Sequence, residues 1–136
     1  MRRWSWIGAV TAIVASTTAI AGAQALPRLI SASSSDRHLV LVARFGDLAP
    51  ATVAAAIKPT TANGALVKAN VRYTARLAHL SRRADGSVRW RSPVKLPART
   101  YWVQVTGQQT DSPPDCVPKF LNCSTMRSNV LRVRLR

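Results

Sequence analysis

The clearest pattern in the chain is a period-two alternation of apolar and polar side chains that follows the turn-forming segment 97–100. The two alternating sets are Tyr101, Val103 and Val105 on one side and Trp102, Gln104 and Thr106 on the other. Alternation among β-branched and aromatic residues predicts a half-buried strand. A turn followed by Tyr is also how the late central strand of many β-sandwiches begins, with the ring in the core and the hydroxyl bound to the preceding corner. We therefore expect a central strand here.

Other short segments show strand patterns as well. They are residues 39–45, 51–58, 71–77, 88–91 and 129–136. Turn signals at Asn63-Gly64 and Asp85-Gly86 separate some of them. Residues 129–136 place Leu131, Val133 and Leu135 on the inner side. Many short strands without a long helix predict an all-β fold, a small antiparallel β-sandwich of about six or seven strands.

The segment 51–58 is the ambiguous one. Its alanines favour a helix by intrinsic propensity. Pro50 and Pro59 bound it to a length that is typical of a strand. We predict a strand and keep a short helix as the alternative.

The C-terminal part of the chain resembles a known family. Thr100-Tyr101-Trp102-Val103-Gln104-Val105, followed after a loop by Ser128-Asn129-Val130-Leu131-Arg132-Val133, resembles the last two strands of fibronectin type III-like domains. Arg99 stands where that family usually has Gly, and the loop is unusually long. The resemblance implies a fibronectin type III-like or Ig-like structural or adhesive module of exported proteins, without an active site.

The N-terminal segment has the three regions of a secretory signal peptide. Arg2-Arg3 give a basic start, residues 7–23 carry no charge, and Ala23-Gln24-Ala25 is a small-x-small cleavage pattern. An uncleaved membrane anchor is the competing interpretation. We expect a signal peptide over 1–25, a flexible serine-rich lead over 26–37, and the sandwich domain over 38–136. The location is then secreted or cell envelope, with no transmembrane segment after cleavage.

The net charge is strongly positive. Lys and Arg number 20 against 5 acidic residues, all of them Asp, which gives +15. Such a balance favours an anionic partner, for example an envelope polymer or another envelope protein with an acidic surface. No DNA- or RNA-binding motif is present, so a specific nucleic acid is not expected. The alternative is that the arginines are incidental and only occupy solvated positions.

In a fibronectin-like sandwich, the strands over 71–77, 101–106 and 129–136 are expected to be neighbours in one sheet. Their outward side chains form a predicted basic face: Arg72, Arg76, Trp102, Gln104, Arg132 and Arg134. We expect the Trp102 indole to stack on a guanidinium from the adjacent strand, which is worth about 0.5–1 kcal/mol at an exposed site.

Cys116 and Cys123 lie in the loop before the final strand, and an exported chain with two cysteines is expected to join them in a disulfide. Two thiols alone do not complete a metal site, and no cofactor is expected. His38 and His79 are the only imidazoles, and no nucleophile motif accompanies them. The sequence therefore predicts a non-enzymatic protein, with an anionic-polymer module and a purely structural or assembly domain as the two hypotheses.

Overall fold

The structure is a computed structural model that describes residues 26–109 and 125–136. Within these ranges it has eleven β-strands and one short 3-10 helix. The longer strands are β1 (Arg28–Ser35), β2 (His38–Arg44), β3 (Leu48–Ala56), β6 (Val71–Arg76), β8 (Val88–Arg91), β9 (Thr100–Gln109) and β11 (Leu131–Arg134). The shorter elements are β4 (Thr61–Ala62), β5 (Ala65–Leu66), η1 (Lys68–Asn70), β7 (Ser81–Arg82) and β10 (Thr125–Arg127).

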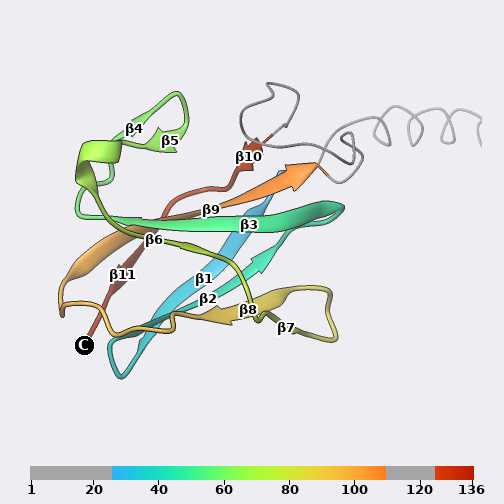
Figure 1. The fold of residues 1–136 in the computed structure, drawn as a ribbon, viewed down its shortest axis with the longest axis horizontal. Helices are drawn as coiled ribbons and strands as arrows, with labels where there is room; N and C mark the ends of the chain where they lie inside the picture. Colours follow the sequence, from blue (N-terminus) through green and yellow to red (C-terminus); the bar gives the residue numbers. More distant parts are fainter. Residues whose placement is uncertain (1–25, 110–124) are drawn as a thin grey trace, which may run out of the picture.

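The strands form two antiparallel sheets that pack face to face (Figure 1). The first sheet has the order β1-β2-β8-β7. The second sheet has the order β10-β9-β3-β6, and β11 also pairs with β9. A separate hairpin, β4–β5, lies beside the second sheet. The fold is therefore the antiparallel β-sandwich that the alternation predicts. The strands are more numerous than expected because β1 and the short hairpin strands were not foreseen.

The core is built by the inward side chains of both sheets. Its fully buried members include Leu39, Leu41, Val53, Ala55, Tyr101, Val103, Val105 and Leu135. The alternation of strand β9 places Tyr101, Val103 and Val105 inward, as the sequence predicts. β9 pairs with three other strands, so it is a central strand of the second sheet.

The segment 51–58 is part of a strand, β3, rather than a helix. β3 lies between β9 and β6, and its Val53, Ala55 and Ala56 are fully buried. Pairing on both edges satisfies the backbone, and small side chains suit a strand covered on both faces. Tertiary pairing thus overrides the helix propensity of alanine.

The flexible lead predicted over 26–37 is wrong for most of that range. Arg28–Ser35 is strand β1, which pairs with β2 from Arg28↔Arg44 to Ser35↔His38. Leu29 is buried, and its backbone N–H and C=O are bound by the side-chain amide of Asn129 at 2.8 and 3.0 Å. Ser31, Ser33 and Ser35 line the solvent side of this edge strand, which gives it the composition of a linker, while Ser34 is half-buried and its hydroxyl bonds the backbone of Arg136. The sandwich therefore includes residues before 38.

Tight turns close the hairpins. Asp36 and Arg37 between β1 and β2, and Asn63 and Gly64 between β4 and β5, all have positive φ (51°, 61°, 53° and 80°). Two successive positive φ values are typical of a type I′ turn, whose twist matches the flanking strands. The Asn63-Gly64 turn signal in the sequence is confirmed.

Two sequence predictions lie outside the described residues: the signal peptide over 1–25 and the disulfide between Cys116 and Cys123. In the part of the chain that the structure describes, no helix has the length and apolar character to cross a membrane.

Candidate anion-binding surface

The arginines of the predicted basic face lie on one sheet but not on adjacent strands. Arg72 and Arg76 project from β6, and Arg132 and Arg134 from β11, all four exposed. The strand order is β6, β3, β9, β11, so β3 separates β6 from β9. With strands about 4.8 Å apart, β6 and β11 are about 14 Å from each other. The expectation that the three strands are direct neighbours is correct for β9 and β11 and wrong for β6.

The middle of this face is covered by the β4–β5 hairpin. Gln104, expected to face solvent, is only 5% exposed. Its side-chain Nε2 donates to the carbonyls of Gly64 (2.8 Å) and Ser128 (2.9 Å), and its Oε1 accepts the N–H of Leu66 (3.2 Å). A face whose central glutamine lies beneath a hairpin is not continuous. The hairpin divides it into an Arg72–Arg76 half and an Arg132–Arg134 half.

Trp102 is half-buried on the outer side of β9, where its register partners are Ala56 on β3 and Arg132 on β11. The predicted indole–guanidinium stack is not formed among the described residues. The cation–π contact that does occur there joins Arg99 to Tyr101, with the guanidinium carbon 5.9 Å from the ring centroid. Register alone brings Arg132 beside Trp102 without placing its guanidinium over the ring.

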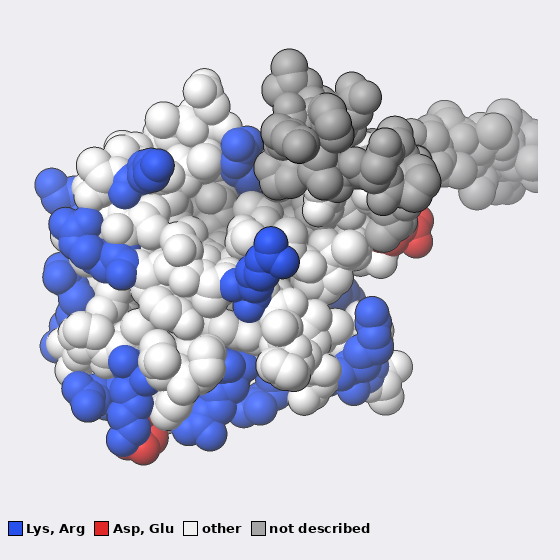
Figure 2. All heavy atoms as spheres, in the orientation of Figure 1, with Lys and Arg blue, Asp and Glu red and all other residues white. Residues whose placement is uncertain are grey.

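Four exposed arginines gather at the end of the sandwich where β1 turns into β2, the chain enters β9, and β11 ends. We call them the basic corner: Arg37, Arg99, Arg134 and Arg136. Figure 2 shows Lys and Arg side chains gathered at this end of the molecule, which carries the C mark in Figure 1. Three segments that are far apart in the sequence thus contribute to one group of positive charges.

Backbone hydrogen bonds fix these three segments against one another. The N–H of Arg37 donates to the carbonyl of Arg136 (3.0 Å), and the N–H of Leu135 donates to the carbonyl of Arg99 (3.0 Å). The N–H of Leu96 donates to the carbonyl of Arg37 (2.9 Å). Because the backbone of each segment is held by another, the relative positions of the corner arginines are set by the fold.

Side-chain contacts position two of the corner guanidiniums. Arg99 lies over the ring of Tyr101, and Arg134 donates from Nη1 to the hydroxyl of Thr100 at 3.4 Å. Neither contact uses a negative charge, so neither reduces the positive field of the corner. Both leave guanidinium N–H groups for an external acceptor.

Two ion pairs engage acids of the described residues, and one of them lies next to the basic corner. Asp36 pairs with Lys95 at 3.1 Å, and that bond lowers the pKa of Asp36 below its ordinary value. Asp85 pairs at 3.3 Å with Arg44, which lies at the opposite end of β2 from the turn that holds Arg37. Among the described residues, no ion pair joins a corner arginine to a carboxylate. Asp36 directly precedes Arg37, and attraction to Arg37 also contributes to the lowered pKa of Asp36, so this acid offsets part of the positive charge of the corner.

The sequence did not reveal the basic corner. The alternation predicts that Arg134 and Arg136 face outward. Their proximity to Arg37 and Arg99 depends on the pairing of β1 with β2 and of β9 with β11. The one signal in the sequence for the corner was the alternation of Arg132, Arg134 and Arg136 with apolar residues. Val133 and Leu135 are buried, so this outward row of arginines continues past the end of β11.

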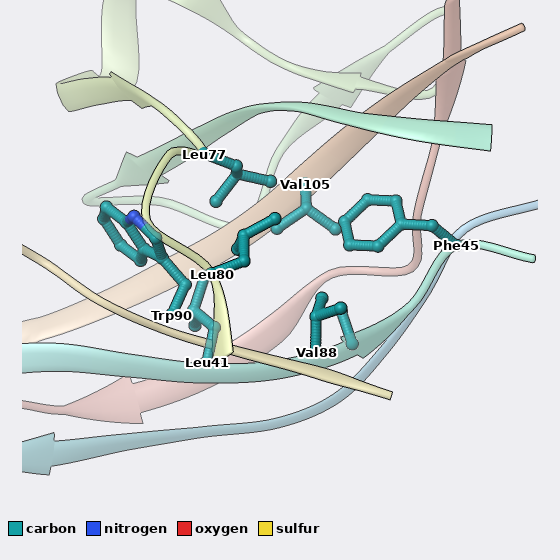
Figure 3. A pocket seen from close by; sticks show the side chains of 8 residues that line it. Leu41, Phe45, Leu77, Leu80, Val88, Trp90 and Val105 are labelled. Carbon is teal, nitrogen blue, oxygen red and sulfur yellow. The ribbon is translucent and has the colours of Figure 1, made fainter. Parts of the chain in front are cut away.

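An apolar gap between the two sheets is the other feature of interest (Figure 3). Its lining is entirely apolar: Leu41, Ala43, Phe45, Leu77, Leu80, Val88, Trp90 and Val105. The space in it that the centre of a water-sized sphere can occupy is about 10 Å³, which is at the lower limit for holding one water molecule. A water there would find no polar partner, so the gap is a dry packing space within the core rather than a ligand pocket.

The histidines do not form a catalytic or metal cluster. The Nδ1 of His38 is 2.8 Å from the carbonyl oxygen of Ser92, and His79 is exposed with a φ of 58°. The described residues contain no group of three or more metal-binding side chains.

In comparisons with known proteins, no protein-family model, curated protein or solved structure matches this chain.

Proposed function

We propose that this protein is an exported, non-catalytic β-sandwich module of the fibronectin type III-like or Ig-like type, which binds an anionic polymer or surface of the cell envelope through its arginines. The export part of the proposal rests on the signal-peptide pattern over residues 1–25.

Strand order supports the assignment to this type. An Ig-like sandwich places strands A, B, E and D in one sheet and C, F and G in the other. With β1, β2, β3, β7, β8 and β9 as A, B, C, D, E and F, the first sheet has the order A-B-E-D, and the second has β9 beside β3. β10 and β11 then take the place of G. β6, on the other edge of β3, takes the place of the additional strand C′.

The observation that carries the binding proposal is the lack of neutralising charge on the sandwich surface. Basic residues outnumber acidic ones 20 to 5, so most arginines have no carboxylate to pair with. The side-chain bonds of Arg72 and Arg134 go to uncharged oxygens, namely the carbonyls of Ala69 and Val71 and the hydroxyl of Thr100. Exposed guanidiniums of this kind bind carboxylate, sulfate or phosphate oxygens in a two-point fork.

A structural or assembly role with incidental charge is the second candidate. It is favoured by the position of Arg72 and Arg76 on β6, an edge strand of the second sheet. If two copies of β6 paired antiparallel about Thr74, Arg72 of each copy would face Arg76 of the other. Charged side chains on edge strands prevent such sheet-to-sheet association.

Reversing the face arginines separates the two candidates. Polymer binding predicts that Arg72→Glu/Arg76→Glu/Arg132→Glu/Arg134→Glu abolishes retention on an anionic column while leaving the melting temperature nearly unchanged. A structural role predicts that the same variant keeps the retention expected of its reduced net charge and does not self-associate, because the introduced glutamates would still repel one another across a β6 pair. It also predicts that the neutral variant Arg72→Thr/Arg76→Thr self-associates at the β6 edge, which sedimentation velocity measures.

The quadruple variant can be separated into two double variants, one for each half of the face on either side of the β4–β5 hairpin. Arg72→Glu/Arg76→Glu and Arg132→Glu/Arg134→Glu change the charge equally, so each is the matched control of the other. Unequal losses of retention locate the binding half. If the quadruple variant is retained like the wild type, the outer face of the second sheet is not the site.

A further inference from the structure

We propose that the basic corner, continued by Arg132 along β11, is the docking track for one extended polyanion. This inference rests on the proposed function and deepens it by naming the site and the form of the partner. The partner is a flexible chain whose sulfate, phosphate or carboxylate groups repeat along its length, rather than a flat membrane surface or a folded acidic protein.

The geometry of β11 supports a linear partner. Arg132, Arg134 and Arg136 are all exposed, while Val133 and Leu135 between them are buried. Alternate residues of an extended strand are about 6.7 Å apart on one side. Arg132 and Arg134 on β11, with Arg136 just past its end, therefore start from successive positions along one line of backbone. This arrangement matches charges repeating along a chain better than charges spread over a plane.

The corner supplies the end of the track. Arg37 and Arg99 are held beside Arg136 and Leu135 by the 3.0 Å backbone bonds between these segments. An anionic group at this point can meet guanidiniums from three different segments. Because the fold has already positioned the three backbones, binding orders side chains but no loop, which lowers its entropic cost.

The β6 arginines are not part of this track. The β4–β5 hairpin, fixed by the bonds of Gln104 to Gly64 and Leu66, lies between them and β11. A polymer on the track therefore runs along one edge of the second sheet and does not cross to Arg72 or Arg76.

The test compares two variants of identical net charge. The corner variant is Arg37→Gln/Arg99→Gln/Arg136→Gln. The matched control is Arg82→Gln/Arg83→Gln/Arg89→Gln, which removes three exposed arginines around β7 and β8. Both are measured beside the wild type on heparin and on immobilised polyphosphate across a salt gradient, with far-UV circular dichroism melting as the check of folding.

The inference predicts that the corner variant elutes at clearly lower salt than the control variant. The slope of log K against log salt should fall by about two to three in the corner variant and by less than about one in the control. A loss confined to heparin identifies a sulfated or carboxylated polymer, and a loss confined to polyphosphate identifies a phosphorylated one.

Equal shifts in the two triple variants would overturn the inference while leaving the proposed function standing, because the polymer would then bind through arginines outside the basic corner. The inference also fails if phosphatidylserine vesicles retain the wild type and neither polymer does, since a membrane is then the partner. A wild type that elutes from every matrix together with an unrelated protein of equal net charge overturns both the inference and the proposed function.

Discussion

The hydroxyl of Tyr101 donates a hydrogen bond to the backbone carbonyl of Pro97, 3.2 Å away. The Tyr101 ring is 2% exposed in the core, so this bond joins the buried centre of β9 to the corner that leads into it. Burial raises the pKa of Tyr101 above its ordinary value of 10.0, so the hydroxyl keeps its proton at neutral pH. A buried ring with its hydroxyl bound to the preceding corner is the arrangement described above for the late central strand of many β-sandwiches.

Replacing Tyr101 with Phe should remove this bond and keep the ring. We expect the free energy of unfolding to fall by about 1 kcal/mol, the usual net value of one hydrogen bond. Urea unfolding measures this change. Tyr73→Phe is the matched control because Tyr73 is half-buried on β6 and its hydroxyl has no hydrogen bond among the described residues. Equal effects of the two substitutions would mean that the bond to Pro97 contributes nothing.

Most of the fold can be predicted from the sequence, because inward-facing side chains recur at every second residue of a strand. Strands β6 and β8 follow that alternation closely, and β9 follows it apart from the buried Gln104. β2 is instead buried at three successive residues, Leu39, Val40 and Leu41, and only its apolar composition and β-branched residues indicate a strand.

Strand β1 was missed because serines on its solvent side resemble a linker. Its pairing with β2, the Asn129 bonds to Leu29 and the bonds of the Ser34 hydroxyl to the Arg136 backbone distinguish it from a linker.

The candidate site was harder to predict from the sequence than the fold, for a different reason. Alternation indicates which side of a strand a residue occupies, and it placed Arg72, Arg76, Arg132 and Arg134 correctly on the outside. It does not indicate what covers that side. The hairpin over Gln104 and the meeting of Arg37, Arg99 and Arg136 both depend on segments distant in the sequence.

Gln104 should be the polar residue whose loss most affects the β4–β5 hairpin. Gln104→Met keeps the approximate volume and leaves the carbonyls of Gly64 and Ser128 and the N–H of Leu66 without their partner. We expect a loss of about 2–3 kcal/mol in the free energy of unfolding, because buried polar groups become unsatisfied. In hydrogen exchange, the Leu66 amide should lose protection while the Val53 amide keeps it. Unchanged protection at Leu66 would contradict the role given to Gln104.

Gly107 should tolerate no side chain. It lies on β9, and a Cβ there would come within 3.0 Å of the Leu48 Cβ and 3.2 Å of the Phe45 Cδ1. Gly107→Ala should therefore lower the free energy of unfolding by about 1–3 kcal/mol through overpacking. Thermal melting with urea unfolding measures the change, and a variant as stable as the wild type would show that Phe45 and Leu48 move aside without cost.

The Asp85 carboxylate should make stability depend on pH in the acid range. The hydroxyl and the backbone N–H of Ser87 donate to it at 2.6 and 3.0 Å, and chiefly these bonds lower the pKa of Asp85 from 3.8 to about 2. Because the folded-state pKa lies below the unfolded value, the ionised group stabilises the fold above pH 3.8, and this contribution is lost as the pH falls towards about 2.

Asp85→Asn provides the comparison. The difference in free energy of unfolding between wild type and variant should be largest near neutral pH and shrink steadily below pH 3.8. Urea unfolding across the acid range measures this difference, and carbon NMR of the carboxyl group measures the pKa itself. A carboxyl that titrates at its ordinary value of 3.8 would contradict the bonds from Ser87.

Retention of the purified protein on heparin across a salt gradient, beside an unrelated protein of equal net charge, tests the central claim most directly. An organised arginine site predicts that this protein elutes at markedly higher salt than the control, because several guanidiniums engage the polymer together. Elution together with the control would contradict the account, since the charge would then act only as a diffuse field over a structural sandwich.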